Sequence, residues 1–439
     1  NPVLLVFSLI FYPWGEPKYV FLMIGSILLF YGCGLAIGHS KQVKWKKFWL
    51  IVSIVTSLSL LGVFKYADFF IGSVNGVLGT KLPFLKLALP IGISFYSFQI
   101  LSYTIDVYRG NVESQKNPIS FGAYVALFPQ LIAGPIVRYI TVEEELSDRP
   151  HTSENFALGA RRFVFGLAKK VLIADTLGLL VGDFAASDDR SVVFYWVYAL
   201  AVSLQLYFDF SGYSDMAIGL GRIFGFHFLE NFNYPFISKS ISEFWRRWHM
   251  SLGHWFRDYV YIPMGGNRVS RGRWICNVLT VWMLTGFWHG ADWTFIIWGL
   301  FFAVFLVLEK FVLNKFFAKL PKVFSHIYVV VAILISFVIF SGNGMSGAIA
   351  DVGGMFGAGG VPLWSSDTGY YLASYAVALV VALVGATPLV KTTVLKIKST
   401  KVGATVIDML EPIFIVAVLT VVTAYFVDGS FSPFLYFRF

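Results

Sequence analysis

Long runs of apolar residues, separated by short polar or basic segments, dominate this sequence. The long runs cover approximately residues 18–38, 48–72, 84–107, 117–137, 191–221, 291–313, 326–341, 369–390 and 409–427. A membrane-spanning helix needs about 20 mostly apolar residues, so these runs predict transmembrane helices. Shorter or more amphipathic runs lie near 155–183, 241–262 and 274–288. We therefore predict an all-α polytopic membrane protein, a single domain over residues 1–439, with roughly a dozen helices, some of them short or re-entrant.

Composition supports a membrane environment. Hydrophobic residues make up 57% of the chain and charged residues 13%, whereas soluble domains carry about 25% charged residues. The net charge of +9 would suggest nucleic acid in a soluble protein. Here the basic residues lie in clusters between apolar runs, and no nucleic-acid motif is present. We expect membrane lipid, and no nucleic acid, as a partner.

Clusters of lysine and arginine predict the orientation. The clusters are Lys41, Lys44, Lys46 and Lys47; Arg268, Arg271 and Arg273; Lys310, Lys315, Lys319 and Lys322; and Lys391, Lys396, Lys398 and Lys401. All should face the cytoplasm. The last helix then carries the tail, residues 429–439, to the extracytoplasmic side. The first apolar run, residues 2–12, is too short to span a bilayer, so we expect it to be the end of a longer or truncated helix.

The segment GFWHGADW contains the strongest catalytic candidate, His289. At about 1.5 Å per residue, the run 274–288 reaches only about 22 Å, which is less than a hydrocarbon core of about 30 Å. His289 should therefore lie within the depth of the membrane, walled by Trp288. Imidazole suits proton transfer near neutral pH. The alternative is a structural histidine bonded to Asp292 or to a backbone carbonyl.

Residues 241–268 combine aromatic side chains with charge. The charged and titratable members are Arg246, Arg247, His249, His254, Arg257, Asp258 and Arg268. This mixture favours a segment that lines a polar cavity or is re-entrant, although an interfacial amphipathic helix has the same composition. His249 and His254 are five residues apart, which is not the usual spacing of a metal-binding pair, and no zinc, phosphate-loop or nucleophile-elbow motif occurs. We expect no metal site.

Two aspartates, Asp209 and Asp215, interrupt the apolar run QLYFDFSGYSDMAIGLG. Carboxylates inside membrane segments are rare, and they are functional or paired. They could also cap or kink a broken helix through Ser211 and Gly212. We favour a structural or positioning role for both.

Three long blocks of the sequence resemble membrane-bound O-acyltransferases. They are QLYFDFSGYSDMAIGLG, ENFNYPFISKSISEFWRRWHMSLGHWFRDYVYIPMGGNR and GFWHGADWTFIIWG. LPIGISFYSFQILSYTIDVYRG, FPQLIAGPIVRY and FSPFLYFRF also fit the bacterial branch typified by the alginate O-acetyltransferase membrane subunit. The resemblance spans essentially the whole chain. It implies helices around a central channel and a location in the bacterial cytoplasmic membrane.

The resemblance also implies roles for the candidate residues. The histidine pair of the family maps onto His249 and His289. His289 would be the general base, and His249 would position the thioester or polarise its carbonyl, with Trp288 and Asp292 in support. The acyl donor would be a cytoplasmic thioester, acetyl-CoA, whose phosphates Arg246, Arg247, Arg257 and Arg268 attract. No tightly bound cofactor is implied.

The aromatic tail suggests where the acyl group goes. Related envelope acylation systems use a tail motif that contains a tyrosine, so Tyr436 could accept the acyl group and pass it outward. The alternative is an aromatic anchor at the membrane surface. The chain has no serine hydrolase domain, so we expect an extracytoplasmic SGNH-hydrolase-like acetyltransferase as partner and an alginate- or peptidoglycan-type polysaccharide as acceptor.

Two other functions are compatible with the sequence. One keeps the fold but transfers D-alanine to teichoic acid. The other is a transporter or flippase, a class that also holds buried charges and broken helices. Transporters often have two related halves, and this sequence has no internal repeat.

Overall fold

The computed structural model describes residues 1–14, 17–429 and 434 of the chain, and all of their regular secondary structure is helical. Within these residues six helices are long and apolar enough to cross a membrane, or seven if the bent pair α18 and α19 forms one span. The predicted all-α polytopic membrane fold is confirmed. The chain divides into two compact units, residues 1–160 with 217–229, and residues 161–216 with 230–439. The prediction of a single domain stays a prediction.

The first unit is built from seven helices and parts of two more. Its helices are α1 (Pro2–Phe11), α2 (Val20–His39), α3 (Val43–Leu61), α4 (Ala67–Leu78), α5 (Ile93–Arg109), α6 (Pro118–Ala126) and α7 (Phe128–Leu131). Helices α8 (Ser153–Ala168) and α10 (Val192–Ile223) have residues in both units.

The second unit contains the remaining helices. They are α9 (Asp175–Ala186), α11 (Ile241–Trp245), α12 (Met250–Phe256), α13 (Arg271–His289), α14 (Trp293–Leu308), α15 (Asn314–Phe317), α16 (Lys322–Ser341), α17 (Gly344–Met355), α18 (Ser366–Ser374), α19 (Ala376–Gly385), α20 (Leu389–Lys398) and α21 (Lys401–Val427). Three π-helical turns also belong to this unit, at Lys169–Ala174, Arg257–Tyr261 and Glu309–Leu313. Such turns are frequent at functional sites.

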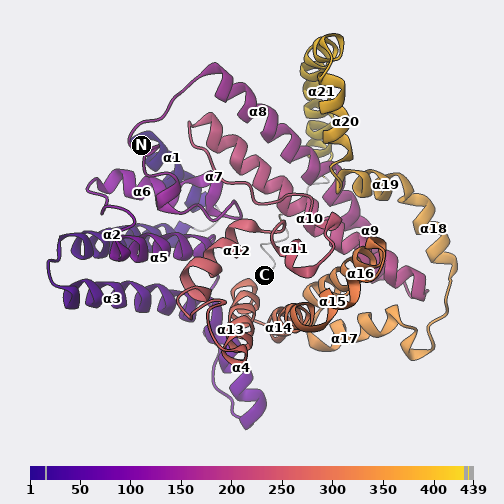
Figure 1. The fold of residues 1–439 in the computed structure, drawn as a ribbon, viewed down its shortest axis with the longest axis horizontal. Coiled ribbons are helices and arrows are strands. Elements are labelled where there is room, and N and C mark those ends of the chain that lie inside the picture. Colours follow the sequence, from indigo (N-terminus) through magenta and orange to yellow (C-terminus); the bar gives the residue numbers. More distant parts are fainter. Residues whose placement is uncertain (15–16, 430–433, 435–439) are drawn as a thin grey trace. The chain divides into compact units, whose positions relative to one another are not determined.

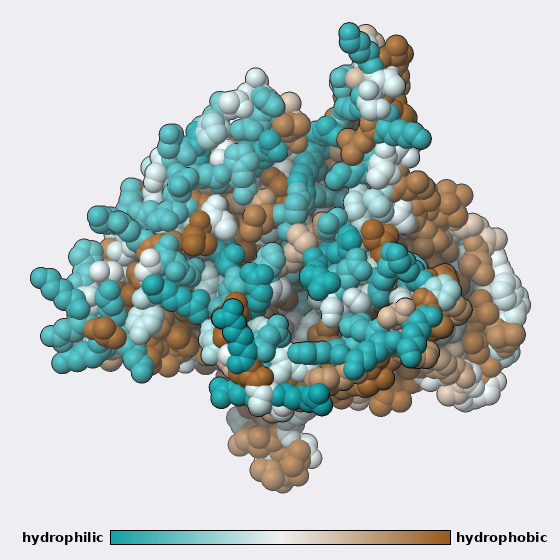
Figure 2. Space-filling view, viewed as in Figure 1, coloured by the Kyte–Doolittle hydropathy of each residue, from teal (hydrophilic) through white to brown (hydrophobic). Residues whose placement is uncertain are grey.

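In the first unit, α2, α3 and α5 lie side by side (Figure 1). A buried hydrogen bond of 2.9 Å joins Ser53 of α3 to Thr104 of α5, and Gly34 of α2 lets the ring of Tyr103 approach its backbone. Helix α4 instead exposes apolar side chains such as Val77 and Leu78, and the brown surface over it in Figure 2 marks this apolar face. These exposed apolar residues suit contact with lipid.

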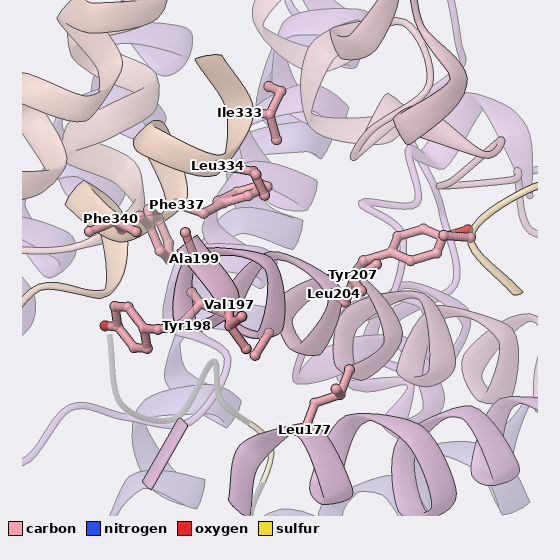
Figure 3. Packing of buried hydrophobic residues seen from close by; sticks show 14 of the residues in the cluster. Leu177, Val197, Tyr198, Ala199, Leu204, Tyr207, Ile333, Leu334, Phe337 and Phe340 are labelled. Atoms are coloured by element: carbon pink, nitrogen blue, oxygen red, sulfur yellow. The ribbon is translucent and has the colours of Figure 1, made fainter. Parts of the chain in front are cut away.

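The core of the second unit packs α10 against α16 and α9. Figure 3 shows the contribution of α10 through Tyr198, Leu204 and Tyr207, with Phe337 of α16 and Leu177 of α9. These side chains are buried. The same helix α10 carries Asp209 five residues after Leu204, so the core fixes the helix that presents this carboxylate.

Helices α13 and α14 form a tight hairpin that presents His289 at its turn. Glycines make the close approach possible: a Cβ atom on Gly286 would lie 2.1 Å from the carbonyl oxygen of Phe295, and one on Gly299 would lie 2.2 Å from that of Trp282. Both neighbours are backbone atoms, which cannot rotate away. The hairpin therefore depends on residues without a Cβ atom at these two positions.

Replacing Gly299 with alanine is expected to lower the free energy of unfolding by about 1–3 kcal/mol, because the methyl group overpacks the hairpin. Gly272→Ala in the first turn of α13 is the control, since no atom lies within 4 Å of its added Cβ. Thermal unfolding of the detergent-solubilised variants compares the two. If both variants were equally stable, α13 and α14 would be able to move apart and accept the methyl group at no cost, which would contradict the prediction.

Several apolar runs differ from the single helices expected. The run 117–137 breaks into α6 and α7 at Leu127, directly before Phe128 and Pro129, and the first part of 84–107 is not helical. The run 369–390 is bent by 60° between α18 and α19. The run 241–262 is broken after α11, at the residues that precede His249.

The length of α13 corrects one argument from the sequence. The helix has 19 residues, which is about 28 Å and nearly the thickness of a hydrocarbon core. Its length alone therefore does not place His289 inside the membrane. The burial of the side chain, which is only 5% exposed, distinguishes it instead.

Candidate active site

His249 lies in a break between two short helices. Helix α11 ends at Trp245, and His249 is the residue before α12, with φ 44° and ψ 52° in the left-handed region. A residue with a side chain rarely adopts this conformation, and such strain is concentrated at functional sites. The side chain is 1% exposed. His249 lies outside the candidate spans, and burial lowers the pKa of its imidazole to about 3, so the ring is neutral at pH 7.

Asn231 holds this break through its side chain and its backbone. Its Oδ1 atom accepts hydrogen bonds from the backbone N–H of Ser251 at 3.2 Å and from the Ser251 hydroxyl at 2.9 Å, and it lies 3.2 Å from Nδ1 of His249. Its carbonyl oxygen accepts from the N–H of Met250 at 3.0 Å. This role could not be predicted from the residues alone, because the asparagines of ENFNYPF are typical of any polar loop.

His289 is the last residue of α13 and is enclosed by aromatic rings. The ring centroids of Trp298 and Phe340 lie 5.1 and 5.5 Å from that of His289. Gly290 follows it, and a Cβ atom there would lie 2.1 Å from the ring of Phe295, so a larger residue would have to displace this ring. Asp292 instead caps α14, accepting hydrogen bonds of 2.8 Å from the N–H and the hydroxyl of Thr294. Asp292 thus holds the start of the helix that follows the turn, and its expected supporting role stays a prediction.

The structure brings the two histidines together. Their ring centroids are 6.4 Å apart, and Trp288, which is buried, contacts both rings. They line different cavities. His249 lines a large cavity of about 780 Å³, and His289 lines a small cavity of about 30 Å³. The pair therefore lies between a cavity of ligand size and a small one with room for little more than a water molecule.

The large cavity has basic side chains among its lining residues. Arg246, Arg257 and Lys310 line it, together with aromatic residues such as Trp274 and Trp282. Arg257 also pairs with Asp258 at 2.7 Å, and the Lys310 ammonium lies 3.5 Å from the ring centroid of Trp274. In the sequence Lys310 is recognisable only as one member of a basic cluster. A cavity with cationic and aromatic walls suits an anionic ligand with an aromatic or apolar part.

Two of the four predicted anion-binding arginines are absent from this lining. Arg247 points its guanidinium at Glu243, 3.0 Å away, and at the carbonyl oxygen of Asn233. Arg268 is exposed and lies next to the lining residue Asn267. The predicted cluster is therefore divided: Arg246 and Arg257 line the cavity, and Arg247 holds the α11 turn.

The two aspartates of α10 are both paired. Asp209 is buried and lies 2.8 Å from Nζ of Lys170, which also donates to Asp175 at 2.7 Å. Asp209 lines the small cavity with His289. Lys170 belongs to the π-helical turn after α8 and was missed in the sequence, although a lysine within an apolar run is a recognisable signal.

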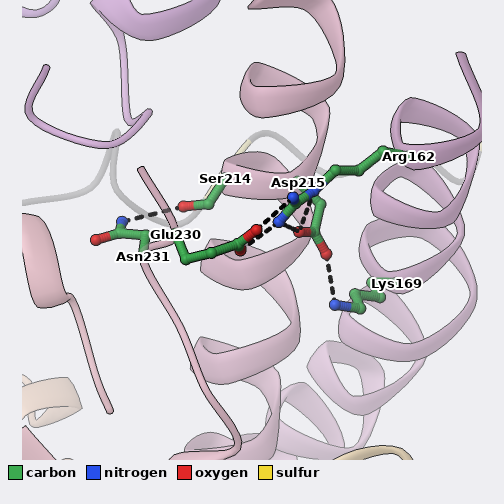
Figure 4. A network of polar contacts seen from close by, with 6 residues as sticks. All are labelled: Arg162, Lys169, Ser214, Asp215, Glu230 and Asn231. Atoms are coloured by element: carbon green, nitrogen blue, oxygen red, sulfur yellow. Dashed lines mark hydrogen bonds and ion pairs between the residues drawn. The ribbon is translucent and has the colours of Figure 1, made fainter. Parts of the chain in front are cut away.

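Asp215 belongs to a separate network near the surface of α10 (Figure 4). It accepts from Arg162 at 2.8 Å and from Lys169 at 2.6 Å, and Arg162 also binds Glu230. Asp215 lines neither of the two cavities described above. The network ties α8 to α10 and to the segment that contains Asn231.

One residue of the aromatic tail reaches the small cavity. Phe434 is buried, lines the same cavity as His289 and Asp209, and has its ring centroid 5.0 Å from that of Tyr213. Tyr436, two residues later, lies outside the described residues. Among the described residues no group of three or more His, Cys, Asp or Glu side chains could hold a metal ion.

Comparison with known proteins identifies relatives over most of the chain. A family model described as "MBOAT, membrane-bound O-acyltransferase family" matches residues 52–348. A protein of Pseudomonas putida named "Probable alginate O-acetylase AlgI" is 38% identical over 462 aligned residues, which cover 100% of this chain and 94% of the relative.

Two further relatives align with this chain over shorter segments. A Pseudomonas aeruginosa protein with the same name is 47% identical over 315 residues, covering 71% of this chain and 61% of the relative. A Helicobacter pylori protein named "Peptidoglycan O-acetyltransferase" is 37% identical over 392 residues, covering 82% of this chain and 74% of the relative. The chain thus aligns with less than two thirds of the Pseudomonas aeruginosa protein.

Proposed function

This chain belongs to the membrane-bound O-acyltransferase family, and from this premise we propose that it transfers an acetyl group from cytoplasmic acetyl-CoA for the O-acetylation of an alginate- or peptidoglycan-type polysaccharide. The observation that carries this proposal is the pair of buried histidines, 6.4 Å apart, between a large cavity with cationic walls and a small aromatic one. The thioester would occupy the large cavity, and the small cavity beside His289 has room for no more than the reacting hydroxyl group itself. We propose the bacterial cytoplasmic membrane as its location.

The large cavity is the proposed donor site. Its volume of about 780 Å³ falls in the usual range of a small-molecule pocket, and Arg246, Arg257 and Lys310 supply positive charge for phosphates. Lys310 belongs to a basic cluster that the positive-inside rule assigns to the cytoplasm. The cavity therefore opens to the compartment that contains acetyl-CoA.

The chemistry assigns His289 as general base. Its imidazole removes the proton of the attacking hydroxyl, the oxygen bonds to the thioester carbonyl carbon, and the carbon–sulfur bond breaks. The proton then passes to the leaving sulfur, so that free thiol is released and no net proton is consumed. The aromatic walls around His289 exclude water, which would otherwise hydrolyse the thioester.

The donor assignment predicts a selective loss of affinity. Purified protein with radiolabelled acetyl-CoA, the partner acetyltransferase and polysaccharide should release CoA thiol over many turnovers. Arg246→Gln should raise KM about five- to tenfold with kcat unchanged, as loss of about 1 kcal/mol of ground-state binding implies. Arg247→Gln is the matched control, because Glu243 holds its guanidinium and it lies outside the cavity lining. No thiol release by the wild type would reject acetyl-CoA as donor, and an equal rise of KM in both variants would reject the assignment of the cavity.

The acyl group is proposed to leave through the tail. Phe434 in the small cavity brings the chain to within two residues of Tyr436, and a phenyl ester keeps much of the transfer potential of a thioester. The tail would be extracytoplasmic, where an SGNH-hydrolase-like acetyltransferase takes the acetyl group from Tyr436 and passes it to the polysaccharide.

Tyr436→Phe tests this relay. The variant keeps the aromatic ring but lacks the hydroxyl, so polymer acetylation in cells is expected to fall to background while the protein accumulates normally. Tyr425→Phe in α21 controls for loss of a tyrosine hydroxyl near the same end of the chain. Full acetylation with Tyr436→Phe would show that the tyrosine is an anchor.

A further inference from the structure

The hydrogen bonds of Asn231 fix the orientation of its amide. The backbone N–H of Ser251 can only donate, so the Asn231 atom that faces it must be the oxygen. Nδ2 then points the other way and donates to Ser214 at 3.1 Å, a contact visible in Figure 4. The amide orientation follows from the network rather than from a choice between two indistinguishable ends.

This orientation determines the tautomer of His249. Nδ1 of His249 lies 3.2 Å from Oδ1 of Asn231, and an amide oxygen can only accept. The Ser251 hydroxyl lies farther from Nδ1, at 3.5 Å, and its single hydrogen is donated to the same Oδ1 at 2.9 Å, so it too faces Nδ1 as an acceptor. Nδ1 must therefore carry the hydrogen. A neutral imidazole has one N–H group, so Nε2 has a lone pair and no hydrogen. Within the described part of the chain Nε2 is buried and has no hydrogen-bond partner.

We propose that Asn231 is a positioning residue that locks His249, which lines the proposed donor cavity, in the Nδ1–H tautomer, so that its buried Nε2 is an acceptor. This inference rests on the proposed function and adds the atom through which His249 acts. An unprotonated Nε2 can accept a hydrogen bond from an N–H of the donor or accept a proton, but it cannot donate to the thioester carbonyl. Of the two roles expected for His249, positioning of the thioester remains and polarisation of its carbonyl by the neutral ring is excluded.

The backbone of Asn231 also helps to position His249. Its carbonyl oxygen holds the N–H of Met250, next to the left-handed conformation of His249. Without this contact the strained turn could relax and rotate the ring away from the cavity. Substitution of the side chain leaves the backbone contact in place, so side-chain variants test the tautomer separately from the turn.

Two substitutions of Asn231 separate tautomer control from packing. Asn231→Asp keeps an acceptor oxygen for Nδ1–H and for Ser251, whereas Asn231→Leu keeps a similar shape but removes it. With acetyl-CoA as substrate, Asn231→Leu is expected to lower kcat by about 10²-fold or more, as loss of a tautomer-holding residue does in other enzymes, with KM within a factor of about three. Asn231→Asp should recover most of kcat. Equal kcat in Asn231→Leu and the wild type would overturn the proposal.

Asn277→Leu is the matched control. Asn277 is also buried in the second unit, but its amide donates to the backbone carbonyls of Met264 and Gly266, and it lies outside the lining of both catalytic cavities. It should lower the melting temperature in detergent without the 10²-fold fall in kcat. If Asn277→Leu reduced kcat as much as Asn231→Leu at the same loss of stability, the effect of Asn231 would be structural and the proposal would fail.

The tautomer itself can be observed without any activity. Nitrogen-15 NMR spectra of histidine-labelled protein, with the His249 signals assigned by their loss in His249→Gln, should show a protonated Nδ1 and an unprotonated Nε2. Asn231→Leu should mix the two tautomers, and Asn231→Asp should retain the first. A wild-type protein with the hydrogen on Nε2 would overturn the inference. An Nδ1–H tautomer in a protein that does not react with acetyl-CoA would reject the proposed function alone.

Discussion

Replacing His289 with alanine is expected to lower kcat for acetyl transfer by about 10²- to 10⁴-fold, the usual contribution of a general base. The structure motivates this size of effect because the imidazole is buried among Trp298 and Phe340 and lines the small cavity. Release of CoA thiol by purified protein, and polymer acetylation in cells, measure the loss.

Two further variants make the result specific to the base. His289→Gln keeps polar bulk between the aromatic rings and should be as inactive as His289→Ala, since an amide does not accept a proton near neutral pH. His326→Gln is the matched control: His326 lies in the same unit, contacts the carbonyl oxygen of Ser238 at 3.1 Å, and lines neither catalytic cavity. Activity near that of the wild type in His289→Gln would reject the assignment of the base.

Replacing Lys170 with methionine is expected to lower the free energy of unfolding by about 3–5 kcal/mol, the cost of removing one partner of a buried ion pair. Lys170 is 6% exposed at its side chain, and its partners Asp175 and Asp209 are 11% and 2% exposed. The variant leaves two buried carboxylates without this cation, one of them in the cavity of His289. Thermal unfolding in detergent and accumulation in the membrane are the measurements.

The neighbouring lysine provides the control. Lys169 pairs with Asp215, but its side chain is 32% exposed and Asp215 also binds Arg162, so Lys169→Met should cost about 1 kcal/mol or less. Combining Lys170→Met with Asp175→Asn and Asp209→Asn should recover stability, because the buried charges are then removed together. If Lys170→Met and Lys169→Met were equally stable, the buried triad would contribute no more than a surface pair.

The two lysines illustrate the limits of reading this chain from its residues. In KKVLIA they are adjacent and alike, and only the packing of the turn after α8 against α10 makes one of them a buried partner of Asp209 and the other a surface residue. Asp209 and Asp215 were recognisable as unusual carboxylates in an apolar run, because charge in such a run is costly. Which aspartate enters the cavity of His289 depends on the direction each faces around α10.

The candidate site shows the same division. His289 could be identified from a histidine between glycine and tryptophan, and its burial supports the choice, although the argument from helix length was wrong. Arg246 and Arg247 could not be told apart in the sequence. In the structure, the chain breaks after α11, so that Arg246 lines the large cavity and Arg247 pairs with Glu243. Asn231 carries no local signal, since its contacts are with residues 17 to 20 positions away.

The sequence by itself determined that the protein lies in a membrane, that it is helical, and which family it belongs to. Hydrophobic burial in lipid follows from composition and run length, and these are properties of the chain read in order. Only the tertiary structure decided that His249 and His289 meet between two cavities, that Lys310 joins the cavity wall, and that Asn231 selects the tautomer of His249. A hydrogen bond depends on distance and direction between atoms far apart in the chain, and packing alone sets both.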